Sequence, residues 1–289
     1  IGTGMKKIYF LSDAHLGSRA SADNRGREQR LCRFLDSIRH EASAIYLLGD
    51  IFDFWFEYHN VIPKGYTRFL GKLSELSDAG IEIHFFTGNH DMWAFDYLHE
   101  ECGVILHTAP MEISLPSLSG NPLTAFVGHG DGLGDPSRGF RFIRAIFHSP
   151  LCQWLFRNIF PADWGMEFGL RWAKSSRLKH SRNAVAENGD TLFVSEDGEA
   201  RNALGDVLSS NMETEEPFQG EANEPLVIFS KQYLREHPTT SFFIFGHRHI
   251  ELDLMLSRQA RLLILGEGIR KYTYAVWDGN ALSLDNFEG

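Results

Sequence analysis

The feature that most constrains this chain is a set of short apolar runs that each end abruptly at glycine, aspartate, asparagine or histidine. Six such runs, rich in β-branched and aromatic residues, occupy 6–15, 43–50, 81–91, 123–131, 241–249 and 261–268. Runs of this kind are typical of buried strands in an α/β sheet. Helix-like stretches at 27–40 and 66–79 separate the first three runs and predict a βαβαβ unit. Alternating residues on either side of Asp278-Gly279-Asn280 predict a β-hairpin within 272–286.

The length of 289 residues is enough to bury a large core, and we expect one α/β domain over 5–289. No sequence window is long and apolar enough to span a bilayer. Residues 1–4 precede the first methionine and are interpreted as a cleavage scar, since nothing there resembles a signal peptide. Cys32, Cys102 and Cys152 are far apart and lack metal-type spacing, which fits free thiols in a reducing compartment. These features predict a cytoplasmic protein.

Charge is distributed unevenly along the chain. The net charge of −10 argues against wholesale nucleic-acid binding. Between 137 and 182, however, there are nine Lys or Arg residues and only two acidic ones, and nine aromatic residues are interleaved with them. This segment predicts amphipathic helices broken around Pro150 and Pro161. Residues 183–225 hold eleven acidic side chains against one arginine and predict an acidic insertion or long loop.

Five strand ends carry the polar groups that a site with two metal ions requires. They are Asp13-Ala14-His15, Gly49-Asp50, Gly88-Asn89-His90-Asp91, Gly128-His129 and Gly246-His247-Arg248-His249. Carboxylate, imidazole and amide ligands together suit divalent ions such as manganese, iron, zinc or magnesium. Alternate residues of an extended segment point the same way, so each Asp-x-His or His-x-His pair can address one centre. Any one of these could be an ordinary polar strand end, but five in order predict a joint site beyond the strands' carboxyl ends.

In this order the motifs resemble the calcineurin-like metallophosphoesterase family, whose fold is an α/β sandwich of β-sheets flanked by helices. The resemblance implies that one divalent metal ion is held by Asp13, His15, Asp50 and His249. It implies that a second ion is held by Asp50, Asn89, His129 and His247. Asp50 would bridge the two ions, and water activated between them would attack phosphorus.

Two residues next to these ligands also receive roles. With Asp50 and Asn89, His90 is a candidate catalytic residue, as an acid or charge stabiliser beside the leaving group. The alternative is that His90 only orders its loop. Asp91 is interpreted as a partner that orients a metal-binding histidine without binding metal itself.

A narrower resemblance is to the branch of UDP-2,3-diacylglucosamine hydrolases. It rests on the runs 49–55, 129–133, 140–141 and 153–156. It implies a manganese-dependent enzyme of lipid A biosynthesis that splits the pyrophosphate of a lipid-linked sugar nucleotide and lies peripherally on the inner membrane. Residues 137–182 would be an inserted helical lid over the acyl chains. The implied substrate contacts are Asn89, His90, Asp135, Ser176, Lys179 and His180.

Two departures and two alternatives accompany this resemblance. The residue after Asn89 is commonly Arg in that branch but is His90 here, and the insertion at 183–225 is longer than usual. A phosphodiesterase or phosphatase for a soluble nucleotide or nucleic acid is a second hypothesis, because basic residues interleaved with aromatic ones also suit single strands. A non-catalytic interaction module is a third. Such relatives generally lose metal ligands, whereas every ligand position is filled here.

Overall fold

The computed structural model describes residues 5–18, 23–134, 147, 149–171, 193–194, 200–201, 218–268 and 271–288. Four of the implied substrate contacts lie outside these residues, namely Asp135, Ser176, Lys179 and His180. The expected scar at 1–4 lies outside them as well. The expected lid and the acidic insertion are each described in part.

The first sheet has six strands in the order β13-β12-β1-β2-β3-β4. Their bounds are β1 (Lys7–Leu11), β2 (Ala42–Leu47), β3 (Glu82–Phe86), β4 (Ile105–His107), β12 (Thr273–Trp277) and β13 (Leu282–Asn286). Strands β1 to β4 run parallel, with α1 (Asn24–Ile38) and α2 (Thr67–Asp78) as the first two crossovers. Strands β12 and β13 form an antiparallel pair. The predicted βαβαβ unit and C-terminal hairpin are therefore confirmed.

The ends of α1 and α2 follow from local chemistry. The side chain of Asp23 accepts a hydrogen bond from the N–H of Gly26 at 2.8 Å, so α1 begins earlier than the predicted residue 27. In α2, Phe69, Leu73 and Leu76 lie on one face and are buried against the first sheet.

The second sheet has five strands in the order β10-β11-β9-β6-β5. Their bounds are β5 (Met111–Leu115), β6 (Leu123–Gly128), β9 (Thr240–Phe245), β10 (Glu251–Met255) and β11 (Arg261–Leu265). Strands β6, β9 and β11 run parallel, and β5 and β10 are antiparallel edges. Helix α7 (Pro225–Glu236) covers the outer face of this sheet, while α3 (Tyr97–Cys102) lies between β3 and β4 in the chain.

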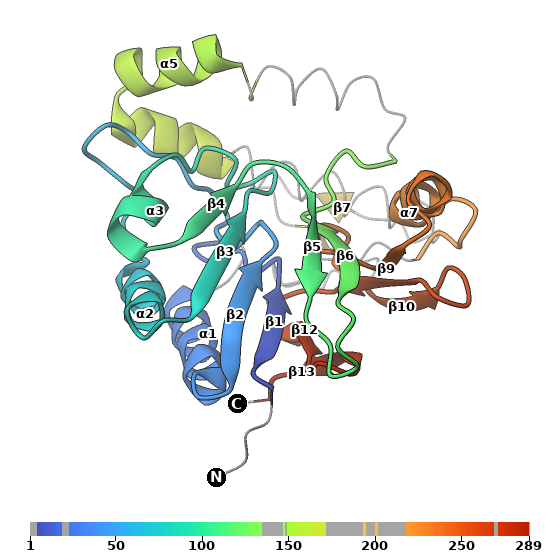
Figure 1. The fold of residues 1–289 in the computed structure, drawn as a ribbon. Coiled ribbons are helices and arrows are strands. Elements are labelled where there is room, and N and C mark those ends of the chain that lie inside the picture. Colours follow the sequence, from blue (N-terminus) through green and yellow to red (C-terminus); the bar gives the residue numbers. More distant parts are fainter. Residues whose placement is uncertain are drawn as a thin grey trace.

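The two sheets pack face to face, with helices outside each of them (Figure 1). Within β1, Phe10 points into the core between the sheets and Tyr9 points toward α1. Within β9, Ile244 points between the sheets and Phe243 points toward α7. Because both faces of these strands are covered, they are nearly continuous runs of apolar residues. The observed architecture is the predicted α/β sandwich.

Two helices lie over one end of the first sheet, α5 (Pro150–Ile159) and a helix at 162–171, and are called here the lid helices (Figure 1). The predicted breaks around Pro150 and Pro161 are confirmed, since one proline opens α5 and the other immediately precedes the second helix. Proline suits a first helical turn because the N–H that it lacks has no helical partner there. No helix in the described ranges is both long and apolar enough to cross a membrane.

The described part of the acidic insertion contains some regular structure. Strand β7 (Phe193–Val194) pairs antiparallel with β8 (Ala200–Arg201), so the insertion contains a short hairpin. Its last residue, Pro225, is the first residue of α7. The predicted boundary therefore coincides with the start of a helix that the sequence analysis did not identify.

Candidate metal centre

The five polar strand ends lie at the carboxyl ends of β1, β2, β3, β6 and β9, and they converge where the two sheets meet. Five ligand candidates there adopt the left-handed backbone conformation. Their φ angles are 53° at Asp13, 41° at His15, 51° at Asp50, 69° at His247 and 53° at His249. Outside glycine, only Tyr272 shares this conformation among the residues that the structure describes. Such a conformation costs about 1–3 kcal/mol per residue and persists only where the surroundings fix it.

This geometry corrects the expectation of extended Asp-x-His and His-x-His segments. The chain turns sharply at each ligand, so that both side chains of a pair come to the same region through left-handed turns.

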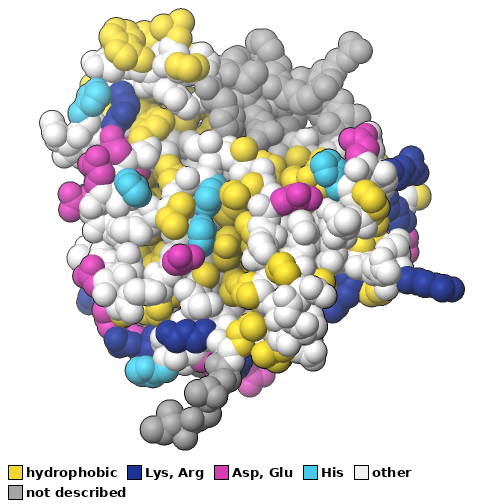
Figure 2. Space-filling model, in the orientation of Figure 1, with side chains coloured by type: hydrophobic (Ala, Val, Ile, Leu, Met, Phe, Trp, Pro, Cys, Tyr) yellow, Lys and Arg dark blue, Asp and Glu magenta, His cyan; other side chains and the backbone are white. Residues whose placement is uncertain are grey.

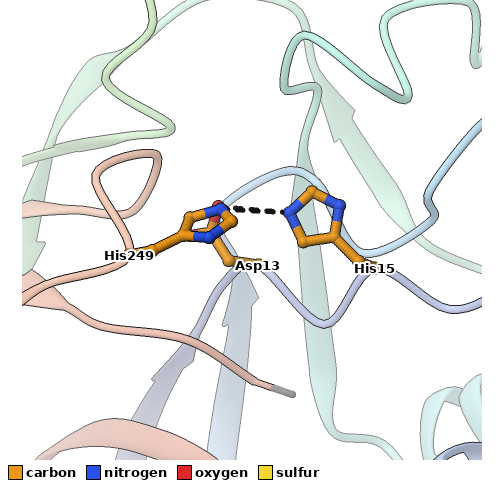
Figure 3. A group of neighbouring side chains, drawn as sticks. All are labelled: Asp13, His15 and His249. Atoms are coloured by element: carbon orange, nitrogen blue, oxygen red, sulfur yellow. Dashed lines mark hydrogen bonds and ion pairs between the residues drawn. The ribbon is translucent and has the colours of Figure 1, made fainter. Parts of the chain in front are cut away.

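The first group of side chains consists of Asp13, His15 and His249 (Figure 3). The Nε2 atoms of His15 and His249 lie 3.1 Å apart, and His249 Nε2 lies 3.2 Å from Asp13 Oδ1. Asp13 Oδ1 is buried and accepts no hydrogen bond, whereas Asp13 Oδ2 accepts one from the N–H of His247 at 2.9 Å. A buried carboxylate oxygen facing two imidazole nitrogens is a donor set that fits a divalent cation.

The second group consists of Asp50, His129 and His247, with Asn89 beside them. His129 Nε2 lies 3.3 Å from Asp50 Oδ2 and 3.2 Å from Asn89 Oδ1. On the other side of the ring, His129 Nδ1 donates to the carbonyl of Leu48 at 2.9 Å. Because a carbonyl can only accept, Nδ1 carries a proton and Nε2 is directed at the carboxylate and the amide.

Asp50 lies between the two groups. Its Oδ2 atom is 4.0 Å from His15 Nε2 and 3.3 Å from His129 Nε2, while Oδ1 accepts from the N–H of His90 at 2.8 Å. Oδ1 of Asp50 therefore fixes the loop that carries Asn89, and Oδ2 faces both groups of ligand candidates. A shared anion in this place reduces the repulsion between two nearby cations.

Burial and charge set the protonation of these groups. Burial lowers the pKa of His15, and burial together with the charge of His129 lowers the pKa of His247 to about 4. Burial raises the pKa of Asp13, but the His249 imidazole 3.2 Å from Oδ1 outweighs burial and brings the value to about 2. Burial likewise opposes a charged His129, yet the charge of Asp50 holds the pKa of His129 well above its usual range. Neutral imidazoles and ionised carboxylates are the forms that bind metal, and a cation can replace the His129 proton.

Asp91 does not have its expected role. Its carboxylate accepts hydrogen bonds from the N–H groups of Gly88 at 2.7 Å, Ile51 at 2.8 Å and Phe52 at 3.4 Å. It thus joins the Asp50 loop to the Asn89 loop, and the prediction that it orients a histidine is wrong.

A further carboxylate that faces a histidine belongs to Asp53, which is fully buried. Its Oδ1 atom lies 3.5 Å from His15 Nδ1, so its carboxylate faces the ring whose Nε2 faces Asp13. Asp53 was not among the predicted site residues. The available signal was a second aspartate three residues after Asp50, within the same apolar run.

His90 borders both the metal centre and a pocket. Its Nδ1 atom donates to the carbonyl of Asp53 at 2.8 Å, and its Nε2 atom lies 4.0 Å from Asp50 Oδ2. The ring therefore orders the loop and also exposes Nε2 to the site. The geometry therefore allows both predicted roles of His90, ordering its loop and acting beside the leaving group.

The pocket beside His90 has a volume of about 370 Å³, including space open to solvent. Its lining is Phe54, Trp55, Asn89, His90, Met92, Trp93, Phe147, Phe168 and Gly169. Most of these side chains are apolar, and the last three belong to the segment of the lid helices. A Cβ atom at Gly169 would lie 2.1 Å from the Phe54 ring, so the glycine allows this close packing. The polar centre thus opens onto an apolar cavity.

Comparisons with known proteins include a relative that matches over nearly the full length. No family model matches the chain. A UDP-2,3-diacylglucosamine hydrolase of Porphyromonas gingivalis is 42% identical over 285 residues, which cover 98% of this chain and 98% of the relative. A UDP-2,3-diacylglucosamine hydrolase of Edwardsiella ictaluri is 31% identical over 176 residues, covering 61% of this chain and 64% of the relative. Among solved structures, a dimetal phosphatase from Danio rerio is 14% identical with a TM-score of 0.42, over 98% of this chain and 96% of that one; a likeness of this size adds nothing to the assignment.

Proposed function

The chain belongs to the family of UDP-2,3-diacylglucosamine hydrolases, and from this premise we propose that it hydrolyses UDP-2,3-diacylglucosamine in lipid A biosynthesis. Water adds to one phosphorus of the pyrophosphate, the bond to the bridging oxygen breaks, and the products are UMP and 2,3-diacylglucosamine 1-phosphate. The observation that carries the proposal is 42% identity to a relative of that name over 98% of both chains. The apolar pocket beside a polar centre supports it independently.

The proposed metal ligands follow the two groups of side chains. Asp13, His15, Asp50 and His249 hold one divalent ion, and Asp50, Asn89, His129 and His247 hold the other. Bound divalent ions, which we propose to be Mn²⁺, stabilise charge on the phosphoryl oxygens and ease deprotonation of the attacking water. The buried Asp13 Oδ1 atom accepts no hydrogen bond, which supports this assignment because an ionised buried oxygen without a hydrogen bond is costly.

His90 acts on the leaving group in this proposal. Its Nδ1 proton is engaged by the carbonyl of Asp53, so only Nε2 is directed at the substrate. In the protonated ring, Nε2 donates a hydrogen bond to the leaving phosphate and stabilises its charge. Asn89 lies next to His90 in the pocket lining. The side chain of Asn89 contacts the phosphate and positions it.

The pocket takes an acyl chain of the substrate. Phe54, Trp93 and Phe168 provide apolar walls, and burial of each methylene there contributes about 0.8 kcal/mol to binding. The metal-bound end of the substrate and its hydrocarbon end would then occupy neighbouring places, with His90 at the boundary. Asp135, Ser176, Lys179 and His180 stay candidate contacts to the sugar nucleotide.

The outer surface of the lid helices is apolar as well, and Figure 2 shows hydrophobic side chains gathered at that end of the molecule. The exposed fractions are 65% at Leu151, 56% at Trp154, 61% at Ile159, 46% at Phe160 and 72% at Trp164. Aromatic and aliphatic residues on amphipathic helices favour the interfacial region of a bilayer. We propose that the protein lies on the cytoplasmic face of the inner membrane through these helices, where a diacylated substrate is found.

The direct test is incubation with UDP-2,3-diacylglucosamine in detergent micelles and Mn²⁺, with mass spectrometry of the products. We expect UMP and 2,3-diacylglucosamine 1-phosphate in equal amounts, and no turnover with a chelator. UDP-glucosamine without acyl chains is the matched control and should be a poor substrate.

The same assay separates the proposal from the second hypothesis. If a soluble nucleotide or an oligonucleotide were turned over faster than the diacylated substrate, the chain would be a phosphodiesterase or phosphatase. Metal analysis of the purified protein, expected to give two ions per chain, tests the ligand proposal apart from the substrate.

A further inference from the structure

A buried ion pair joins the start of α7 to the turn that carries two proposed metal ligands. Glu224, the residue before α7, is completely buried, and its side chain does not cap that helix. Instead its two oxygens accept hydrogen bonds from Arg248, at 2.8 Å from Nε and 3.3 Å from Nη2. A planar guanidinium held at two points fixes the orientation of the segment to which it belongs.

Arg248 lies between two histidines that face different groups. His249 is in the group with Asp13, and His247 is in the group with Asp50. Both histidines have left-handed backbone conformations, with φ of 53° and 69°, so the turn needs outside support to keep its shape. The ion pair provides such support at the residue between them.

The same turn of α7 also contacts the loop that follows His129. A Cβ atom at Gly134 would lie 2.1 Å from the carbonyl oxygen of Pro225, and one at Gly130 would lie 3.2 Å from Leu226. The carbonyl of His129 accepts a hydrogen bond from the N–H of Gly246 at 3.0 Å, next to the His247 turn. The first turn of α7 therefore packs against both loops that carry histidines of the second sheet.

We propose that Glu224 and Arg248 are positioning residues for both metal ions. Their ion pair holds the His247–His249 turn so that one imidazole faces each of the two groups. The proposal rests on the ligand set given above and not on the identity of the substrate. It explains why a carboxylate is buried at the end of the acidic insertion, far along the chain from Asp13 and Asp50.

The test is a calorimetric titration of the metal-free protein with Mn²⁺ alone. Glu224→Gln should weaken both binding events about 10- to 100-fold, the usual effect of losing a residue that orients metal ligands. Both events should weaken because the turn carries a histidine for each ion, whereas Asn89→Ala should weaken one.

Glu28→Gln is the matched control. Glu28 is also buried, receives the N–H groups of Arg68 and Phe69 at 2.9 and 3.1 Å at the start of α2, and lies 3.7 Å from Arg68 Nη1. Like Glu224, it is a buried carboxylate beside an arginine at a helix start, but its hydrogen bonds go to α2 and to no ligand turn. We expect this variant to melt at a lower temperature with unchanged Mn²⁺ affinity.

The double variant Glu224→Gln with Arg248→Gln separates positioning from stability. It leaves no unpaired buried charge, so its melting temperature should recover relative to Glu224→Gln even if that single variant folds poorly. Its Mn²⁺ affinity should stay low, and Arg248→Lys should fall between it and the parent. Wild-type affinities in Glu224→Gln, or affinity that recovers together with stability in the double variant, would overturn the proposal. Since no substrate is used, failure of the lipid assay would leave this result unaffected.

Discussion

The metal centre and the lid helices are supported in opposite ways. At the metal centre, buried side chains are surrounded by fixed backbone hydrogen bonds, such as the three that Asp91 accepts. Among the described residues, the lid helices have few such anchors. Arg157 of α5 lies 4.6 Å from the centre of the Phe95 ring, and just before α5 the carbonyl of Phe147 accepts a hydrogen bond from Trp93 at 2.7 Å.

Side chains are also less exposed to solvent at the metal centre than on the lid helices. Asp13 and Asp53 are fully buried, whereas Leu151 and Trp164 on the lid helices are more than half exposed. Under the proposed function, this difference assigns bond cleavage and substrate selection to separate parts of the molecule. Changes at the metal centre should affect every phosphoester substrate, and changes on the lid helices should affect lipid substrates alone.

Chelation should have the largest effect and should leave the lid and the core in place. EDTA should abolish hydrolysis of the lipid and of a small soluble diester alike, because the ligands converge from both sheets. The circular dichroism spectrum should be largely unchanged, since the strands owe their stability to the apolar core between the sheets. Mn²⁺ should restore activity. Loss of the spectrum on chelation would mean that the metal holds the fold together.

Asp50→Ala comes next. Removing the carboxylate that faces both groups should lower turnover of both substrates by at least about 100-fold and should reduce the bound metal. Asp36→Ala, at an exposed aspartate on α1, is the control and should behave like the parent. Parental activity and metal content in Asp50→Ala would contradict the whole assignment of the centre.

Asp53→Asn should produce a smaller loss at the same place. The amide is nearly isosteric but lacks the negative charge opposite His15 Nδ1, so metal affinity should fall about 10- to 100-fold. Measurement with both substrates sharpens the comparison, because the lipid and the diester should lose activity equally. A loss confined to the lipid would place Asp53 among substrate contacts instead.

Substitutions on the lid helices should have the smallest effect, and they should affect the lipid substrate but not the diester. Trp154→Ser, at a largely exposed residue, should raise the KM for the diacylated substrate in vesicles several-fold. It should leave diester hydrolysis unchanged and alter the free energy of unfolding by no more than about 0.5 kcal/mol. The KM values and a thermal melt check this directly.

Phe156→Ser on the same helix is the companion variant. Its ring packs 4.9 Å from Trp93 and 5.5 Å from Phe56, so it should also loosen the lid from the domain. Equal losses on lipid and diester in both variants would mean that the lid helices merely support the fold.

Most of the metal centre could be predicted because its signals are local. Each ligand follows an apolar run, and parallel strands bring their carboxyl ends to one region, so Asp13 and His247 meet despite their separation. Asp53 was not predicted as a site residue because its contact with His15 depends on how the loop after Asp50 turns. A sequence gives the distance along the chain but not the direction in which that loop turns.

The missed elements have similar causes. Strand β10 alternates charged and apolar residues from Glu251 to Leu254, which is an edge-strand pattern that was available. Helix α7 begins at the last residue of the acidic segment, and no prediction covered the residues after it. Its Leu226 and Val227 are buried against the second sheet. The way in which the two sheets pack against each other has no local signal in the sequence, because it depends on how the side chains of the core interlock.

The left-handed ligand residues also have an evolutionary consequence. Glycine adopts such φ angles without steric cost, so replacing Asp13 or His249 by glycine would relieve the backbone while destroying the ligand. Mutational drift toward a more stable protein therefore runs against catalysis at each of these positions. Only continued selection for the reaction keeps them, and a lineage released from that selection should lose its ligands first at the turns where the chain is most contorted.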